Sequence, residues 1–419
     1  FFFKQKTAYE IVDCDWSSDV CSSDLFIYLF FLSIFSLVFL FDKHNVGNNW
    51  TISEWLINYQ GGFTRRGLLG DLAFYISTYF DVKIRFIIFF LQTIFYFIFI
   101  ILTFNFFKKI KLNSLSRLSL YVPIFLLYPL ARLDALGRKE TIIFLFYIVF
   151  LILASKNFNK KYCNWFTIFI LPISLLIYEP IIFFFPFIIL ILFLKNYNKD
   201  YLNVIKKILL IISPSIIIFL FIINNPLSEK GHEKMCLSLL TNFKEDCGMA
   251  LSLLKTKSSI TEQFIANFPY YKFSNLLRYL LIIIIGFLPL FILSANSKFN
   301  KQIKIISHFD NFLQLLLILL IFSFSILLFM QDWGRAVNIA YTFSIFTFFF
   351  LFKNNYINIK RSKFYLLTLK VFKNKIIYFT IFFLYCFCWN IKILITEKIS
   401  FFQFYKIIIR FLKILISYS

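Results

Sequence analysis

The sequence predicts an all-α fold, a polytopic membrane helix bundle of about eleven transmembrane helices. Its 419 residues are 60% hydrophobic, include 63 Phe and have a mean hydropathy of +0.78, far above a soluble domain. Long apolar runs recur throughout, and short Lys-rich clusters separate them. Although the net charge is +23, the basic residues form no contiguous basic domain, so nucleic acid is not a predicted partner.

The N-terminal segment differs from the rest of the chain. KQKTAYEI and DWSSDVCSSDL, at Lys4 to Ile11 and Asp15 to Leu25, are what two adapter oligonucleotides of short-read sequencing encode in one reading frame. We therefore expect residues 1–25 to be an adapter-derived artefact and exclude them from the fold prediction. The predicted transmembrane domain then covers residues 26–396.

The predicted spans follow the apolar runs. One crossing takes about 17 to 20 residues, and shorter runs are tolerated in a packed bundle. The spans are Phe26 to Phe41, Phe86 to Phe107, Ser119 to Ala131, Thr141 to Ala154, Trp165 to Tyr178, Ile181 to Leu194, Ile208 to Ile223, Leu277 to Ala295, Asn311 to Met330, Ala336 to Phe352 and Ile376 to Trp389.

The charges predict which loops face the cytoplasm. Alternate loops carry the Lys clusters Lys108 to Lys111, Lys156 to Lys161, Lys195 to Lys199, Lys298 to Lys304 and Lys360 to Lys363. By the positive-inside rule these loops are cytoplasmic. The outer loops are then 42–85, 132–140, 224–276 and 331–335, and they hold most of the acids.

The first outer loop opens with Asp42 and contains TISE, a capping box with Thr51 as N-cap and Glu54 at the third helical position. This pattern predicts a helix that lies along the membrane interface with Trp55 as its anchor. The capping role is the simpler interpretation of Glu54. A catalytic carboxylate is the alternative.

Arg65 and Arg66 follow in the same loop and precede a helix predicted to begin near Gly67. Two guanidinium groups at this position are repelled by the positive end of the helix dipole, which is unfavourable unless an anion lies between them. Since the planar guanidinium matches phosphate with two parallel hydrogen bonds, we predict a phosphate-binding pair. Interaction of these side chains with lipid headgroups is the alternative.

The second outer turn, ARLDALGRKE, holds Arg132, Asp134, Arg138, Lys139 and Glu140. So many ionisable residues between apolar helices indicate mutual pairing and a functional site. A surface salt-bridge cluster is the alternative.

Two further outer turns carry isolated charges. Glu179 stands in a long apolar stretch beside Pro180, where a charge is costly unless it is paired or functional. Asp332, Gly334 and Arg335 repeat the residue order of the second turn. We predict that Arg335 also binds substrate phosphate and that Glu179 is a candidate catalytic carboxylate.

The long outer segment predicts a disulfide between Cys236 and Cys247, because an outer loop is oxidising. His232 and Glu233 are too few for a metal motif, so no metal site is predicted. Residues 397–419 predict an amphipathic surface helix with Lys406, Arg410 and Lys413 on one face.

A first helix, an outer loop that opens with an acid, and short hairpins with charged outer turns resemble the type C membrane glycosyltransferases and, nearly as well, the O-antigen polymerases. The resemblance covers most of the chain as architecture. It implies a bacterial inner-membrane enzyme whose active face is outward. Its implied partners are membrane lipid, a polyprenyl-phosphate-linked sugar donor and a saccharide or lipid acceptor.

The resemblance also implies residue roles. In the type C family an Asp or Glu of the first outer loop acts as the base, a role that would fall to Asp42 first and to Glu54 second. From the charged turns themselves, Asp134 and Glu179 are the further candidates after Asp42. The donor phosphate would be bound by Arg65, Arg66, Arg132, Arg138, Lys139 and Arg335. The sequence requires no cofactor and leaves the need for a divalent metal open. A transporter or flippase of a lipid-linked saccharide and a non-catalytic assembly subunit are the other functional hypotheses.

Overall fold

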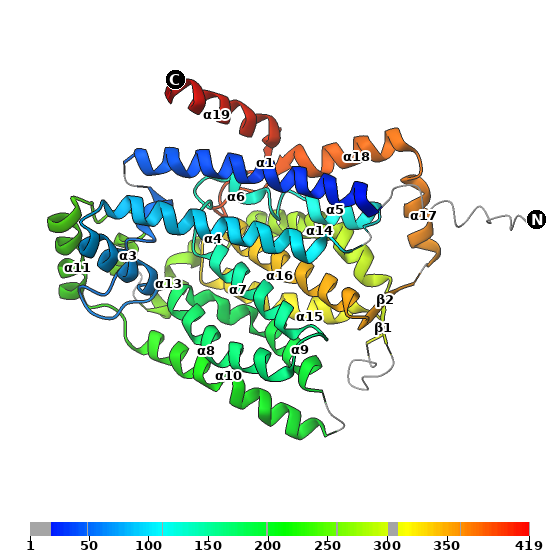
Figure 1. Ribbon diagram of the computed structural model, residues 1–419, viewed down its shortest axis with the longest axis horizontal. Helices are drawn as coiled ribbons and strands as arrows, with labels where there is room; N and C mark the ends of the chain where they lie inside the picture. Colours follow the sequence, from blue (N-terminus) through cyan, green and yellow to red (C-terminus); the bar gives the residue numbers. More distant parts are fainter. Residues whose placement is uncertain are drawn as a thin grey trace, which may run out of the picture.

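Almost every element of the computed structural model is a helix (Figure 1). The structure describes residues 18–47, 49–110, 112–197, 200–256, 259–300, 309–360 and 362–418. In order the elements are α1 (Ser18–Asn45), α2 (Trp50–Ser53), α3 (Leu68–Phe80), α4 (Ile84–Phe107), α5 (Ser114–Tyr121), α6 (Tyr128–Ala131), α7 (Glu140–Ala154), α8 (Lys160–Ile177), η2 (Glu179–Phe184), α9 (Phe185–Asn196), α10 (Tyr201–Asn224), α11 (Glu229–Phe243), α12 (Ser252–Thr256), α13 (Ile260–Asn267), η3 (Phe268–Tyr270), α14 (Phe273–Ala295), β1 (Ser297–Phe299), α15 (Phe312–Phe324), η5 (Ser325–Leu328), α16 (Trp333–Lys353), β2 (Ile357–Ile359), α17 (Lys363–Val371), α18 (Lys375–Phe387), β3 (Trp389–Asn390), β4 (Ser400–Phe401) and α19 (Gln403–Tyr418).

Six helical segments in the described part of the chain are long and apolar enough to cross a membrane. They are Ser23–Asn45, Ile84–Phe107, Glu179–Asn196, Tyr201–Asn224, Phe273–Ala295 and Trp333–Lys353. Shorter apolar helices cover Glu140–Ala154, Phe312–Leu328 and Lys375–Phe387. The predicted helical fold is therefore confirmed, and the apolar helices fit a multi-pass membrane bundle. The full count of eleven spans stays a prediction.

The bundle packs around α16. Nearly every side chain of α16 is buried, whereas α10 exposes large apolar side chains such as Leu209, Leu210 and Ile217 along its outer side. Exposed hydrocarbon at this density is unfavourable in water and favourable in lipid. The peripheral helices therefore supply the lipid-facing surface, and α16 supplies the core.

The predicted span Ser119 to Ala131 is wrong as a continuous helix. The chain forms α5, then a turn, then α6. Pro123 forces Val122 into an extended conformation and ends α5. Asn338 of α16 donates to the carbonyls of Ile124 and Phe125 at 2.8 and 3.1 Å, so the backbone acceptors released by the break are satisfied inside the bundle.

The Lys-rich loops meet at one end of the bundle. The Lys195 ammonium donates to the carbonyls of Ser155 and Phe158. Strands β1 and β2 pair antiparallel and join two further Lys-rich loops (Figure 1). Lys111, Lys199, Lys301, Lys304 and Arg361 of these loops lie outside the described residues. This grouping agrees with the predicted topology, and the orientation in the membrane stays a prediction.

Reporter fusions test this orientation. The positive-inside rule predicts that the Lys clusters are cytoplasmic, so fusions after Asn157 and Asn300 should report the cytoplasm, and a fusion after Asn225 should report the exterior. Alkaline phosphatase and green fluorescent protein, which are active on opposite sides of a bacterial membrane, give paired readouts. The reverse pattern at all three positions would place the charged turns described below on the cytoplasmic side.

The first outer loop differs from its prediction. Asn49, not Thr51, is the N-cap, and α2 is a single turn. Trp55 is 1% exposed, and its indole N–H donates to the carbonyl of Gly137 at 2.8 Å. The predicted interfacial helix with Trp55 as a membrane anchor is therefore absent from the described residues. This segment packs into the protein because the turn before α7 provides its hydrogen-bond acceptor.

Candidate functional site

A cavity of about 600 Å³ opens between the predicted outer loops. We call it the arginine cavity. Its charged lining side chains are Glu54, Arg65, Arg66, Asp134, Arg138, Glu179, Asp332, Arg335 and Glu397. Its apolar lining includes Phe183, Phe219, Ile222, Ile223, Leu253 and Phe329. The cavity thus joins a charged region to a hydrocarbon wall, as a ligand with a charged group and an apolar chain requires.

Glu54 lies at the centre of the charged region and is 1% exposed. Its carboxylate oxygens lie 3.2 Å from Arg66 Nη1 and 3.1 Å from Arg138 Nη1. Arg335 Nη2 is 3.8 Å away. The predicted capping box is therefore wrong, because this carboxylate forms ion pairs with three guanidinium groups instead of capping a helix.

The electrostatics of Glu54 follow from these contacts. Burial alone raises the pKa of its carboxyl group, but Arg138, Arg335 and Arg66 together lower that pKa from 4.5 to about 2. Glu54 is therefore ionised at neutral pH. A carboxylate with so low a pKa is a weak proton acceptor, which disfavours Glu54 as a general base.

Arg66 makes two parallel hydrogen bonds to Glu179. Its Nε and Nη2 atoms donate to the two carboxylate oxygens at 2.7 and 2.8 Å. Arg65 Nη1 lies 3.9 Å from the same carboxylate. The anion that the sequence requires beside these guanidinium groups is supplied in part by Glu179, from a turn 113 residues away from Arg66.

The local backbone directs Arg66 toward this partner. Arg66 has φ of +63°, in the left-handed region, and α3 begins directly after Gly67 as the sequence predicts. A non-glycine residue pays a conformational cost for this φ. The bidentate contact with Glu179 offsets that cost, so the loop and the η2 turn hold each other in place.

Arg335 connects the arginine cavity to α7. Its guanidinium donates to Glu140 and, at 2.7 Å, to Asp332 Oδ2. Gly334 beside it has no room for a side chain, since a Cβ would lie 1.9 Å from the carbonyl oxygen of Lys392. The glycine therefore lets the loop between β3 and β4 approach closely and close one side of the cavity.

Lys139 lies beneath the cavity and is completely buried. Its ammonium donates to the backbone carbonyl of Arg66. Burial lowers its pKa from 10.5 to about 7, since the attraction of Glu54 only partly compensates for the loss of solvation and Arg66 repels it. Lys139 holds the Arg66 loop in position and does not line the cavity.

This low pKa predicts that stability depends on pH. Between about pH 7 and pH 10.5 the unfolded chain holds one more proton at Lys139 than the folded protein, so the free energy of unfolding rises with pH in this window. Replacing Lys139 with Met should remove that rise. The measurement is the melting temperature of the detergent-purified protein at about pH 7 and about pH 9. The exposed Lys230→Met is the control, and equal pH slopes in all three proteins would contradict the assignment.

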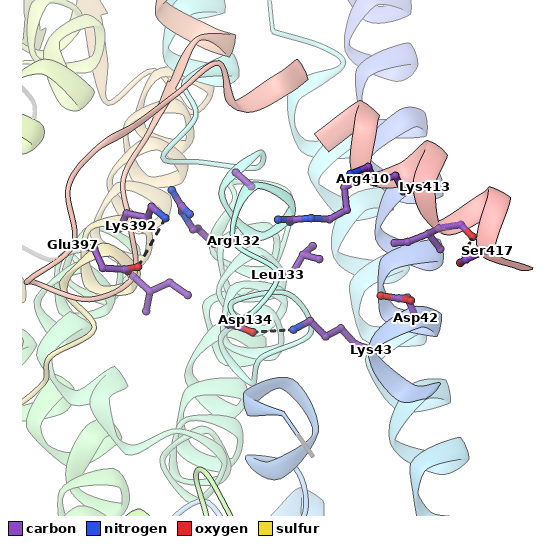
Figure 2. Close-up of a pocket in the computed structure, with 13 residues that line it drawn as sticks. Asp42, Lys43, Arg132, Leu133, Asp134, Lys392, Glu397, Arg410, Lys413 and Ser417 are labelled. Carbon is purple, nitrogen blue, oxygen red and sulfur yellow. Dashed lines mark hydrogen bonds and ion pairs between the residues drawn. The ribbon is translucent and has the colours of Figure 1, made fainter. Parts of the chain in front are cut away.

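A second cavity of about 620 Å³ lies beside the first (Figure 2). On one side it is lined by the end of α1 and by α19, and on the other by the turn between α6 and α7 and the loop between β3 and β4. We call it the basic cavity. Its charged lining side chains are Asp42, Lys43, Arg132, Asp134, Lys392, Glu397, Arg410 and Lys413. Asp134, Ile393 and Glu397 line both cavities, so the two are adjacent.

The structure divides the predicted site residues between these cavities. Glu54, Arg65, Arg66, Arg138, Glu179 and Arg335 line the arginine cavity. Asp42 and Arg132 line only the basic cavity, and Asp134 lines both. The predicted leading base, Asp42, thus lies apart from the Arg65 and Arg66 pair.

Sequence reasoning missed Glu397, which lines both cavities. It lies in the loop between β3 and β4, where its Oε2 accepts from the backbone N–H of Leu394 at 3.2 Å. No motif marks this loop. Only its packing against the second outer turn places Glu397 at the site, through the hydrogen bond from Arg132 Nε to the carbonyl of Ile391 at 2.9 Å.

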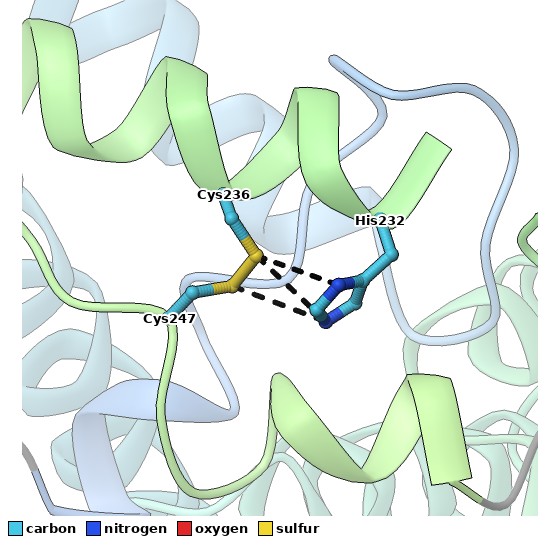
Figure 3. A group of neighbouring side chains, drawn as sticks. All are labelled: His232, Cys236 and Cys247. Carbon is cyan, nitrogen blue, oxygen red and sulfur yellow. Dashed lines mark hydrogen bonds between the residues drawn. A yellow bond between two sulfur atoms is a disulfide. The ribbon is translucent and has the colours of Figure 1, made fainter. Parts of the chain in front are cut away.

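The long outer segment contains the disulfide between Cys236 and Cys247 that the sequence predicts (Figure 3). His232 lies beside it, and its Nε2 is 3.1 Å from the carbonyl oxygen of Leu251. Because the two sulfur atoms are bonded to each other, neither is a thiolate ligand for a metal. His232 therefore belongs to the local packing of α11.

The fold is that of a helical protein whose long apolar helices fit a multi-pass membrane protein, and its two cavities adjoin a network of ion pairs. Neither a family model, a curated protein nor a solved structure matches the chain. Its function is therefore argued from the geometry of the two cavities alone.

Proposed function

We propose that the protein is a glycosyltransferase that takes its donor sugar from a polyprenyl-phosphate carrier at the outer face of the membrane. The arginine cavity carries this proposal. It places Arg65, Arg66, Arg138 and Arg335 in one lining with an apolar wall. Guanidinium groups suit the phosphate, and the apolar wall suits the polyprenyl chain.

The carboxylates of Glu54 and Glu179 support a site in which a bound phosphate replaces an internal partner of the arginines. Glu179 occupies the paired donors of Arg66, and Glu54 balances the remaining charge. A donor phosphate that enters the cavity would compete with Glu179 for the paired N–H donors of Arg66. The planar carboxylate and the tetrahedral phosphate both present two oxygens that accept parallel hydrogen bonds. The arginines would then stabilise the phosphate as the leaving group.

The acceptor requires a base at the edge of this cavity. Asp134 lies at the junction of the two cavities, and its side chain is 48% exposed. Its Oδ1 accepts from Lys43 at 2.9 Å, and among the described residues no donor contacts Oδ2. We therefore assign Asp134 as the group that accepts the proton of an acceptor hydroxyl.

Arg66→Lys tests the phosphate contact. Lysine keeps the charge and loses the planar fork, so transfer activity should fall by roughly ten- to a hundredfold at equal protein level. Activity is measured as restored surface polysaccharide in a strain that lacks the gene. Membrane protein is quantified by immunoblot.

Arg85→Lys is the matched control. Arg85 makes the same kind of fork, to Glu245, with Nε and Nη2 donating at 2.5 and 2.8 Å, and it does not line the arginine cavity. Its activity should stay within about twofold of the wild type. Full restoration by Arg66→Lys, or equal losses in both variants, would leave Arg66 as a structural residue and remove the support for a phosphate site.

A further inference from the structure

The basic cavity has more positive than negative side chains in its lining. The cations are Lys43, Arg132, Lys392, Arg410 and Lys413, and the acids are Asp42, Asp134 and Glu397. The proposed transfer uses only Asp134 from this set. The remaining cations therefore need a separate explanation.

Two of the cations have acidic partners. Lys43 lies 2.9 Å from Asp134 Oδ1, and Lys392 lies 3.8 Å from Glu397 Oε1 (Figure 2). These pairs leave three cations, Arg132, Arg410 and Lys413, and one acid, Asp42, so the remaining lining keeps a positive excess.

The other three cations have no carboxylate within ion-pair distance among residues 18–418 as described. Arg132 donates to the neutral oxygens of Ile391 and Ser400. Arg410 reaches from α19 toward Arg132, and Lys413 lies one turn further along the same helix (Figure 2). Like charges that converge on a cavity are unfavourable unless an anion joins them.

Helix α19 is held against α1 by its apolar residues. Ile407 and Ile414 are buried, and the ring of Phe411 lies 4.7 Å from that of Phe35. At the end of the helix, the hydroxyl of Tyr418 accepts from Asn45 at 3.1 Å. These contacts fix α19 along the outer half of α1, so Arg410 and Lys413 have a defined place in the cavity wall.

The opposite face of α19 is apolar and exposed. Leu412, Leu415 and Ile416 are uncovered. A helix on a water surface would bury such residues. Arg410 and Lys413 line the cavity and are themselves exposed, whereas Leu412, Leu415 and Ile416 are exposed on the other side of the helix. Helix α19 therefore separates the basic cavity from an apolar, lipid-facing surface.

We propose that the basic cavity binds a phosphate group at a second site, separate from the arginine cavity. Arg132, Arg410 and Lys413 supply the donors, and the lipid-facing side of α19 gives a membrane-embedded phosphate a short path to them. The volume of about 620 Å³ falls within the range of small-molecule sites. The phosphate comes from a lipid headgroup or from a soluble phosphate ester. This binding does not depend on the proposed glycosyl transfer.

The test measures binding by the full, detergent-purified chain without any transfer assay. Inorganic pyrophosphate is titrated by calorimetry. Phosphatidic acid and phosphatidylcholine are each supplied in mixed micelles, and bound lipid is counted by native mass spectrometry. In Arg410→Gln/Lys413→Gln, the affinity for the phosphate probe should fall at least about tenfold, since two charge-assisted contacts are lost.

Lys230→Gln/Lys234→Gln on α11 is the control, because it removes the same charge from exposed positions outside the cavity. The test variant leaves Ile407, Phe411 and Ile414 unchanged, and an unchanged melting temperature verifies the fold. Selective loss of phosphatidic acid identifies a lipid source, and selective loss of pyrophosphate identifies a soluble one. Equal affinity in wild type and Arg410→Gln/Lys413→Gln overturns the proposal. So does a wild-type protein that binds no pyrophosphate and does not prefer phosphatidic acid to the zwitterionic phosphatidylcholine.

Discussion

Asp134→Asn is expected to lower transfer activity by about 10²- to 10⁴-fold, the usual contribution of a general base. The amide cannot accept the proton of the acceptor hydroxyl. The change is almost isosteric, and the side chain is half exposed, so the protein should fold and insert normally. Activity is measured as restored surface polysaccharide per amount of membrane protein.

Asp81→Asn is the control for this substitution. Asp81 ends α3 in the left-handed region, with φ of +51°, where asparagine is well tolerated, and it lines neither cavity. It should keep full activity. If Asp134→Asn restores polysaccharide as well as Asp81→Asn does, the base lies elsewhere, and Glu397 at the same junction is the next residue to replace.

Glu54→Gln is expected to destabilise the protein by about 3 to 5 kcal/mol, because removal of one partner leaves buried charges uncompensated. Arg66, Arg138 and Arg335 would then repel one another around a neutral amide. Most of the detergent-purified protein should aggregate or melt early. Size-exclusion chromatography and the melting temperature give the measurement.

A charge-matched second substitution separates repulsion from lost packing. In Glu54→Gln/Arg138→Gln the excess charge is removed, so a substantial part of the stability should return as a coupling between the two sites. Glu229→Gln, whose side chain is 79% exposed, is the negative control and should change stability by less than about 0.5 kcal/mol. A wild-type melting temperature in Glu54→Gln would show that the carboxylate does not hold the cluster together.

The pKa of Glu54 sets the pH range of this effect. The folded carboxyl has a pKa of about 2, below its ordinary 4.5, so the unfolded chain takes up its proton first as the pH falls. The stabilisation is therefore complete above about pH 4.5 and is lost as the pH falls toward 2. The difference in melting temperature between wild type and Glu54→Gln should be constant at neutral pH and shrink only in acid.

The sequence determined the features that depend on local composition. The length of the apolar runs predicts the multi-pass helical class, because burial in lipid needs a minimum run and little else. The start of α3 after Gly67, the short turn between α6 and α7, and the pairing of Cys236 with Cys247 also follow from nearby residues. The charged outer turns were recognisable because charges between apolar helices are costly without partners.

Only the tertiary structure determined which charged side chains form ion pairs with each other. Glu54 has an adequate local explanation as a capping residue, yet long-range packing places it among three arginines. Arg335 finds Glu140 across 195 residues, and Glu397 reaches both cavities through a loop without a motif. Such pairings depend on how helices far apart in the chain pack side by side, and local residue spacing carries no record of that arrangement. The division of the site into two adjacent cavities was therefore visible only in the folded protein.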